Sequence, residues 1–183
     1  MIWEQINEDR KNVKITHYKN AFPEAINDIN FTTLVEINQY KSAVSKIDEF
    51  KNGGSQIKDV NLDKRLQKYL LDFQKHYERH ETETGFTACL FFSLNDGHPG
   101  LLLHHDYETV LLIQGYGEIA YLVTDAEMNN KKIYHCKTGD ALLLPRFTNH
   151  KPLIIGPRVT LSLGANPVNN ITNGIYEKNW KNY

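Results

Sequence analysis

Two histidines and an aspartate close the apolar run in "LLLHHDYETV", residues 101–110, and their spacing suits a metal ion. Side chains of an extended chain alternate between two faces, so His104 and Asp106 point one way and His105 the other. Such an H-x-D pair presents one imidazole and one carboxylate to a single cation. A third ligand must come from elsewhere, because without one the triplet is only a polar strand end.

His150 is the best candidate for that third ligand. It follows an apolar segment and the turn "PRFTNH" and stands 44 residues after Asp106. Two histidines and one carboxylate on one face of an octahedron leave three positions open, which suits Fe(II) chemistry with a chelating co-substrate and oxygen. Zinc with the same ligands stays an alternative. The predicted catalytic and metal-binding set is therefore His104, Asp106 and His150.

Helical patterns fill the part of the chain before residue 85. Residues 30–50 carry a loose apolar stripe, and residues 61–80 carry a clearer one with charges opposite. Asn61 is a candidate N-cap for the second helix. Between the two, "KNGGSQ" at residues 51–56 is typical of a flexible connector.

Strand patterns take over after residue 85. The segments 86–94, 109–123, 131–145 and 158–165 are rich in β-branched and aromatic residues and are separated by turns such as "NDGHPG" and "KTGD". This pattern predicts an antiparallel barrel or jelly roll with helices packed outside it. We expect one mainly β domain of 1–183, with a helical N-terminal support (1–84), a β core (85–166) and a C-terminal tail (167–183).

Composition narrows the class of protein. The formal net charge is −1 with 23% charged residues, which argues against a general nucleic-acid-binding surface. Cys89 and Cys136 lack metal-site spacing and are expected to be buried thiols. No apolar run approaches the length of a membrane span, and the N-terminus lacks the apolar core of a signal peptide, so we expect a cytoplasmic protein.

The segment 91–166 resembles the cupin-type JmjC oxygenases, in particular the ribosomal-protein hydroxylases. The blocks that carry the resemblance are "NDGHPGLLLHHD", "TVLLIQGYGE", "TGDALLLPRFTNH" and "TLSLG", in the family's order and spacing. The resemblance implies a double-stranded β-helix, with His104, Asp106 and His150 as iron ligands. It also implies hydroxylation by O2 coupled to decarboxylation of 2-oxoglutarate.

One position departs from the family pattern. The ribosomal enzymes usually place a Lys or Arg for the distal carboxylate of 2-oxoglutarate where this chain has Ile119. Arg158, followed by Thr160 on the same strand face, is similar to the Arg and Ser/Thr pair that serves this purpose in other 2-oxoglutarate oxygenases. The alternative is an exposed strand-end arginine. Gln114 either lines the barrel or simply ends a strand.

The primary substrate stays open. Only about twenty residues follow Gly164 in this sequence, so we expect no counterpart of the large C-terminal region of the ribosomal enzymes. The candidates for the substrate are a small molecule, a peptide and a macromolecular side chain. Two other functions compete: a metal-dependent cupin enzyme that does not use 2-oxoglutarate, and a non-catalytic cupin binding module. We expect His98, in a glycine-proline loop, to be exposed to solvent. We expect His135, on a strand, to be a structural residue.

Overall fold

The structure is a computed structural model, and it describes residues 2–42, 53–58, 60, 63–77, 84–96, 100–125, 127 and 129–167. The elements are α1 (Ile2–Lys11), β1 (Thr16–Tyr18), α2 (Ala25–Asp28), α3 (Phe31–Ser42), β2 (Gly54–Lys58), α5 (Lys64–His76), β3 (Thr84–Ser93), β4 (Thr109–Thr124), β5 (Lys131–Lys137), β6 (Ala141–Leu144) and β7 (Asn149–Pro167).

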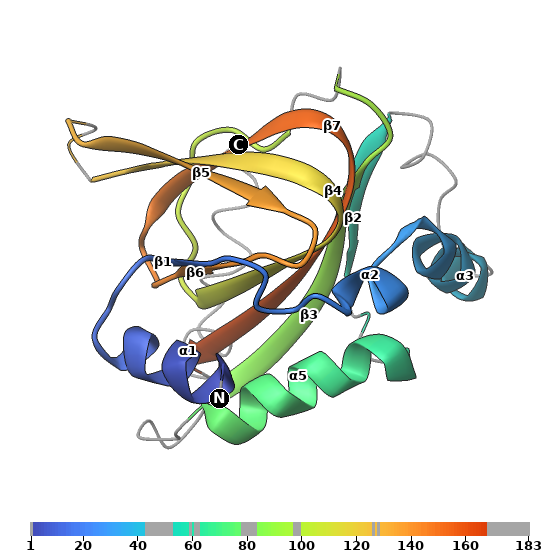
Figure 1. Cartoon of the computed structure of the whole chain (residues 1–183), viewed down its shortest axis with the longest axis horizontal. Helices are drawn as coiled ribbons and strands as arrows, with labels where there is room; N and C mark the ends of the chain where they lie inside the picture. The colour runs from blue at the N-terminus through green and yellow to red at the C-terminus, as the bar shows by residue number, and fades with distance from the viewer. Residues whose placement is uncertain are drawn as a thin grey trace.

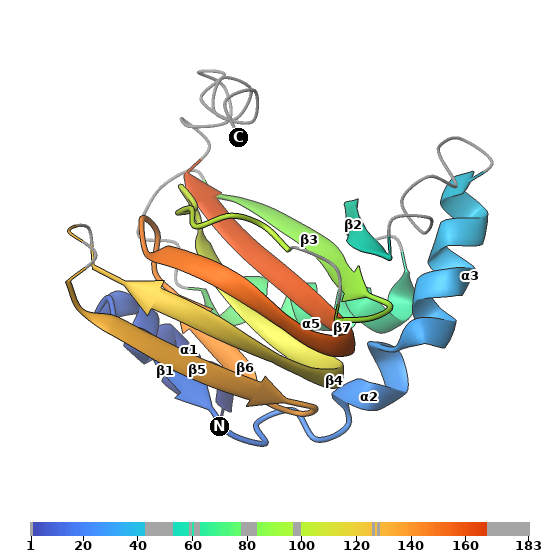
Figure 2. The same cartoon turned by 90° about the horizontal axis from the view of Figure 1, so that it is seen from above.

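Two long strands, β4 and β7, organise the whole sheet. The strand order is β1-β6-β4-β7-β3-β2, with β5 also paired to β4, and all pairs are antiparallel. The first half of β4 lies between β6 and the second half of β7, whereas its second half lies between β5 and the first half of β7. The sheet thus curls over on itself as a double-stranded β-helix (Figures 1 and 2), which confirms the predicted fold class.

Gly117 lies where β4 bends from one half of the curled sheet into the other. The pairing with β7 shifts register on either side of it, between Gln114 and Tyr116 and between Gly117 and Ile119. Its φ of 73° is in the left-handed region, and a Cβ there would overlap the carbonyl oxygen of Pro157. Only glycine therefore lets β4 turn this closely against β7.

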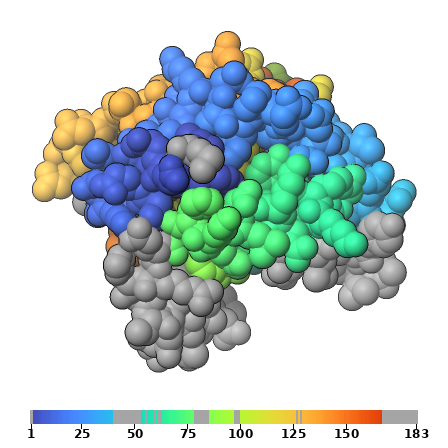
Figure 3. Space-filling view, turned by 60° about the horizontal axis from the view of Figure 1, so that its bottom comes forward, coloured from blue at the N-terminus to red at the C-terminus, as the bar shows by residue number. Residues whose placement is uncertain are grey.

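The outer face of the sheet is covered by the N-terminal helices. Leu66, Leu70 and Phe73 of α5 pack with Ile6 of α1 and with buried sheet residues, among them Leu111 of β4. Figure 3 shows the N-terminal segments and α5 side by side over this face. The apolar stripe predicted in residues 61–80 is therefore the surface that buries the outer face.

A second apolar cluster fills the inside of the curled sheet. Because side chains alternate along β4 and β6, Leu111 and Leu143 belong to the outer core while Leu112 and Leu142 belong to the inner one. Ile119 also lies in the inner cluster, which consists of Val110, Leu112, Ile119, Tyr121, Val123, Tyr134, Cys136, Leu142 and Leu144.

Two local expectations were wrong. The helix α5 begins at Lys64 and its N-cap is Asp63, not Asn61, because the Asp63 carboxylate accepts a hydrogen bond from the backbone N–H of Arg65 at 2.9 Å. The expected connector at 51–56 ends early, since Gly54 begins β2, which pairs along β3. The apolar stripe of residues 30–50 is a helix as far as Ser42, and residues 43–50 lie outside the described part of the chain.

The part of the chain before β3 also contributes two strands, β1 and β2, to the sheet. The strand β1 is fixed by a buried carboxylate. Asp140, 8% exposed, accepts hydrogen bonds from the backbone N–H groups of Asn20 and Lys137 and contacts Nε2 of His17 at 2.9 Å. Burial opposes its ionisation, but these hydrogen bonds outweigh burial and hold the pKa of Asp140 below its usual value.

In the described ranges no helix is long and apolar enough to cross a bilayer.

Replacing Asp140 by Asn should lower the free energy of unfolding by about 2 kcal/mol at pH 7, since a charged acceptor of several hydrogen bonds is lost. The folded-state pKa is the lower one, so the contribution is present above the usual aspartate pKa and is lost as the pH falls through the folded value. Urea unfolding at neutral and at strongly acidic pH measures this. A difference between wild type and variant that persists unchanged in acid would contradict the assignment.

Candidate metal centre

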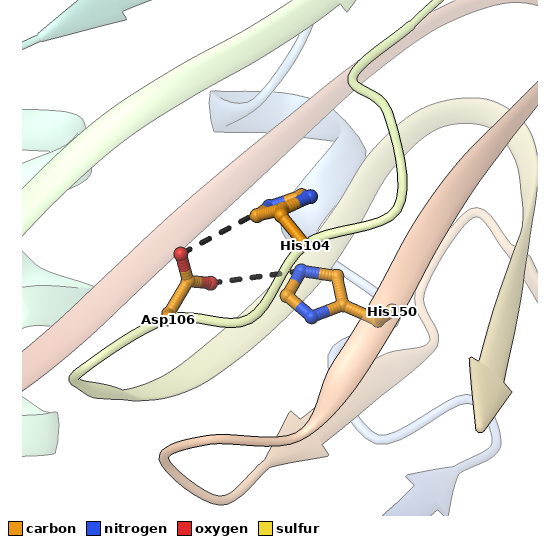
Figure 4. A group of neighbouring side chains, drawn as sticks. All are labelled: His104, Asp106 and His150. Atoms are coloured by element: carbon orange, nitrogen blue, oxygen red, sulfur yellow. Dashed lines mark ion pairs between the residues drawn. The ribbon is translucent and has the colours of Figure 1, made fainter. Parts of the chain in front are cut away.

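The structure brings His104, Asp106 and His150 together at one end of the barrel (Figure 4). One potential ligand atom from each residue lies within 4.8 Å of the others. Asp106 stands between the imidazoles, with its oxygens 3.9 Å from Nε2 of His104 and 3.6 Å from Nε2 of His150. The two histidines are also neighbours in the backbone, because each donates its N–H to the carbonyl of the other at 3.0 and 2.7 Å.

Backbone carbonyls fix the orientation of both imidazole rings. Nδ1 of His104 lies 2.7 Å from the carbonyl oxygen of Leu102, and Nδ1 of His150 lies 2.9 Å from that of Thr148. A carbonyl only accepts, so in each neutral ring Nδ1 carries the proton and Nε2 keeps its lone pair. Both Nε2 lone pairs face the side on which Asp106 lies. A ring whose other N–H is held by a backbone carbonyl is the usual arrangement of a metal-binding histidine.

The electrostatic environment favours neutral imidazole at His150. Burial lowers the pKa of this residue, although the negative charge of Asp106 opposes the shift. A neutral ring is the form that binds a metal ion. Two imidazoles and a carboxylate, presented from one side, fit a divalent transition metal with open positions on the other side.

His105 lies away from the metal-binding group, as alternation predicts. Its ring is exposed and packs near Tyr107 and Phe147, with centroids 5.6 and 6.0 Å away. The turn that carries Phe147 also donates the Phe147 N–H to the carbonyl of Asp106 at 2.7 Å. The two ligand-bearing segments are therefore joined by main-chain and aromatic contacts behind the carboxylate.

Arg158 is buried inside the barrel and is 5% exposed, so it is not a solvent-facing strand-end arginine. Among the described residues its one hydrogen bond runs from a terminal guanidinium nitrogen to Oγ1 of Thr160 at 2.8 Å, and its Nε has no acceptor there. No carboxylate in the described part of the chain lies within ion-pair distance of it. Burial lowers its pKa, yet an arginine stays protonated in proteins. The inner barrel thus contains an uncompensated positive charge.

Polar neighbours hold Arg158 in place. Thr160 donates its hydroxyl to Oε1 of Gln114 at 2.6 Å, and Gln114 donates in turn to the carbonyl of Tyr116. Burial raises the pKa of nearby Tyr121 to about 12, so that phenol stays neutral. Gln114 therefore lines the barrel, which is the first of the two alternatives that the sequence left open. The sequence does not identify it as a site residue, because nothing in its spacing links it to Thr160.

The other positions discussed from the sequence fall outside this centre. Ile119 is fully buried in the inner apolar cluster and supplies no charge. His135 is exposed and pairs with Glu118 at 2.9 Å, which fits a structural residue. His98 lies outside the described residues. Cys89 and Cys136 are both free thiols.

The motif "TLSLG" has a steric explanation at its glycine. A Cβ on Gly164 would overlap both the carboxylate of Glu108 and the hydroxyl of Thr87, which lie 3.2 Å apart across β7. The absence of a side chain at Gly164 lets Glu108 lie over this strand at the open end of the barrel. Ser162 shares the face and is paired with Cys89 of β3.

Known structures with the same fold include a ribosomal oxygenase and an alpha ketoglutarate dependent epimerase. YcfD from Escherichia coli aligns over 93% of this chain and 56% of its own, with 13% identity and a TM-score of 0.65. The non-heme alpha ketoglutarate dependent epimerase SnoN from nogalamycin biosynthesis aligns over 91% and 83%, with 9% identity and a TM-score of 0.60. YcfD described as a ribosomal oxygenase in complex with cobalt and 2-oxoglutarate aligns over 67% and 34%, with 18% identity and a TM-score of 0.51.

Neither a family model nor a curated protein matches the sequence. The chain spans between about a third and a little over half of the YcfD chains it matches at these scores. At identities this low the likeness establishes the fold, and it agrees with the double-stranded β-helix that the resemblance implied.

Proposed function

We propose that this protein is an Fe(II)- and 2-oxoglutarate-dependent oxygenase that hydroxylates a substrate bound at the open end of the barrel. The ligand set His104, Asp106 and His150 would hold the iron, and Arg158 with Thr160 would bind the far carboxylate of 2-oxoglutarate. The similar proteins whose descriptions mention 2-oxoglutarate or alpha-ketoglutarate dependence support this assignment.

The observation that carries the proposal is the unpaired Arg158. A buried charge without a counterion costs several kcal/mol, and the described residues offer no carboxylate to compensate it. A bound dicarboxylic acid would supply that charge, and the guanidinium binds a carboxylate through two parallel hydrogen bonds. This pairing also favours 2-oxoglutarate dependence over a cupin enzyme that needs no acidic co-substrate.

Each residue has a definite part in the reaction. Bound iron would supply the oxygen activation that the side chains lack. His104 and His150 would hold it through Nε2, and Asp106 would supply the negative charge. Arg158 and Thr160 would bind the far carboxylate of the acid, while the inner apolar cluster around Ile119 and Tyr121 would exclude water from it.

Succinate formation tests the proposal. Purified protein with Fe(II), ascorbate and oxygen should convert 2-oxoglutarate to succinate and CO2 slowly without substrate and faster when a substrate is added. Succinate is measured by NMR. The control reaction replaces 2-oxoglutarate by 2-oxoadipate, which is one methylene longer. Absence of 2-oxoglutarate binding by calorimetry in the metal-loaded protein would refute the proposal and favour the metal-dependent cupin enzyme that does not use 2-oxoglutarate.

A further inference from the structure

Asn166 is a buried side chain with nothing to bind. Its exposed fraction is 0%, and in the described part of the chain neither its amide nitrogen nor its amide oxygen has a hydrogen-bond partner. Buried polar groups are almost always satisfied, because an unmet donor or acceptor costs about the desolvation of that group. An asparagine that keeps both atoms unmet requires another explanation.

The residue faces the inside of the barrel. β7 pairs with β3 without a register shift from Ser93–Arg158 to Thr84–Pro167, so Arg158, Ser162 and Asn166 all lie on one face. Arg158 stands at the bend end of this face and Asn166 at the opposite end. The residue paired with Asn166 on β3 is Gly85, which has no side chain that could serve as a hydrogen-bond partner.

Asn166 lies at the end of the barrel where the metal ligands enter. The pairing of β4 with β7 begins at Thr109 and Ala165, so the chain just before β4 passes alongside Asn166. Asp106 is three residues before Thr109, which an extended chain spans in about 10 Å. A molecule held by the Asn166 amide would thus be within reach of the metal-binding group.

The surroundings of Asn166 do not favour an anion. The carboxylate of Glu108 lies over Gly164, the neighbouring inward position of β7. Burial, followed by the charges of Glu108 and Asp106, raises the pKa of the Cys89 thiol on the same side of the sheet to about 12. A carboxylate or phosphate bound here would meet the same negative potential.

We propose that Asn166 is a substrate-recognition residue whose carboxamide pairs with a neutral amide group of the primary substrate. A primary carboxamide offers a donor and an acceptor side by side, which is the complement of the two unmet atoms of Asn166, whereas the N–H and C=O of a trans peptide bond point in opposite directions. The substrate class is then a molecule or a side chain that bears a primary carboxamide. This inference rests on the proposed function, because it takes the open end of the barrel as the substrate side.

A stability measurement separates recognition from a structural role. Replacing Asn166 by Leu, which has nearly the same shape, removes two unmet polar atoms and should raise Tm by about 2–6 °C. The matched control is Asn30→Leu, because Asn30 makes hydrogen bonds to the carbonyls of Ile26 and Asn27 and accepts one from the N–H of Thr33. That variant should lower Tm. A fall in Tm for Asn166→Leu would assign the residue to the fold and overturn the proposal.

A binding measurement tests the ligand class in the Zn(II)-loaded protein with 2-oxoglutarate. The probes are acetamide and acetone, which have nearly the same shape but differ in the N–H donor. Saturation-transfer NMR should detect the amide and not the ketone, and the Asn166→Leu variant should reduce the amide signal at least fivefold. Equal signals from both probes, or an amide signal unchanged in the variant, would overturn the proposal. The measurement involves no turnover, so its outcome is separate from a failure of succinate formation.

Discussion

The Asp106→Ala variant should lose metal binding by more than about 100-fold and lose all 2-oxoglutarate turnover. Partners that merely orient metal ligands already contribute 10- to 100-fold, and Asp106 would be a direct ligand and the sole anionic one in the described group. The two imidazoles that remain would lack the charge that balances a divalent cation. Calorimetric titration with Co(II) in place of Fe(II) measures the affinity without oxidation.

The His105→Ala variant is the matched control for this result. His105 lies next to Asp106 but faces away from the metal-binding group, so the metal affinity of the variant should change less than about threefold. Both variants should keep the wild-type circular dichroism spectrum, since neither side chain belongs to the buried core. If His105→Ala abolished metal binding and Asp106→Ala did not, the assignment of faces would be wrong.

The Arg158→Met variant should raise the KM for 2-oxoglutarate by about 100-fold or more while leaving Co(II) affinity nearly intact. Removing one member of a buried, hydrogen-bonded charge pair costs 2–5 kcal/mol. The same substitution should stabilise the protein in the absence of the acid by about 1 to 3 kcal/mol, because it removes a buried charge without a partner. Titration of the acid and urea unfolding measure the two effects.

The Arg158→Lys variant distinguishes charge from geometry. Lysine keeps the positive charge but cannot bind a carboxylate through two parallel hydrogen bonds, so it should fall between Met and wild type. An unchanged KM in Arg158→Met would remove this residue from the co-substrate site. A loss of stability in Arg158→Met without the acid would show instead that the guanidinium holds the barrel together.

Strand patterns predicted an antiparallel barrel or jelly roll, the family resemblance implied the double-stranded β-helix, and alternation with motif spacing predicted the convergence of the three candidate ligands. The H-x-D pair lies on one face because the period of an extended chain is two, and His150 was placed by its position after an apolar strand and a turn. Arg158 was found through its likeness to the Arg and Ser/Thr pair of other 2-oxoglutarate oxygenases, and alternation placed it on one face with Thr160. These signals are local, so a single sequence carries them.

The parts that were not predicted depend on contacts between distant segments. Asn166 is an ordinary asparagine in the sequence, and only the pairing of β7 with β3 and β4 shows that both of its amide atoms are unmet. The link from Gln114 to Thr160 spans 46 residues and has no local pattern. The strand β2 was taken for a connector because Gly53 and Gly54 favour turns, whereas an edge of β3 was free to pair with it.

The continuity of β7 has a consequence for which acids the barrel accepts. His150 and Arg158 belong to one strand, Asn149–Pro167, with no loop between them. The metal ligand and the proposed carboxylate-binding residue are therefore carried by the same strand, whose pairing with β4 is interrupted between them only over residues 155–157. The separation between His150 and Arg158 on this strand should therefore set the length of the dicarboxylic acid that binds. An acid one methylene longer than 2-oxoglutarate would have to bend to reach both residues, and a preference for it would require an insertion or deletion within the strand.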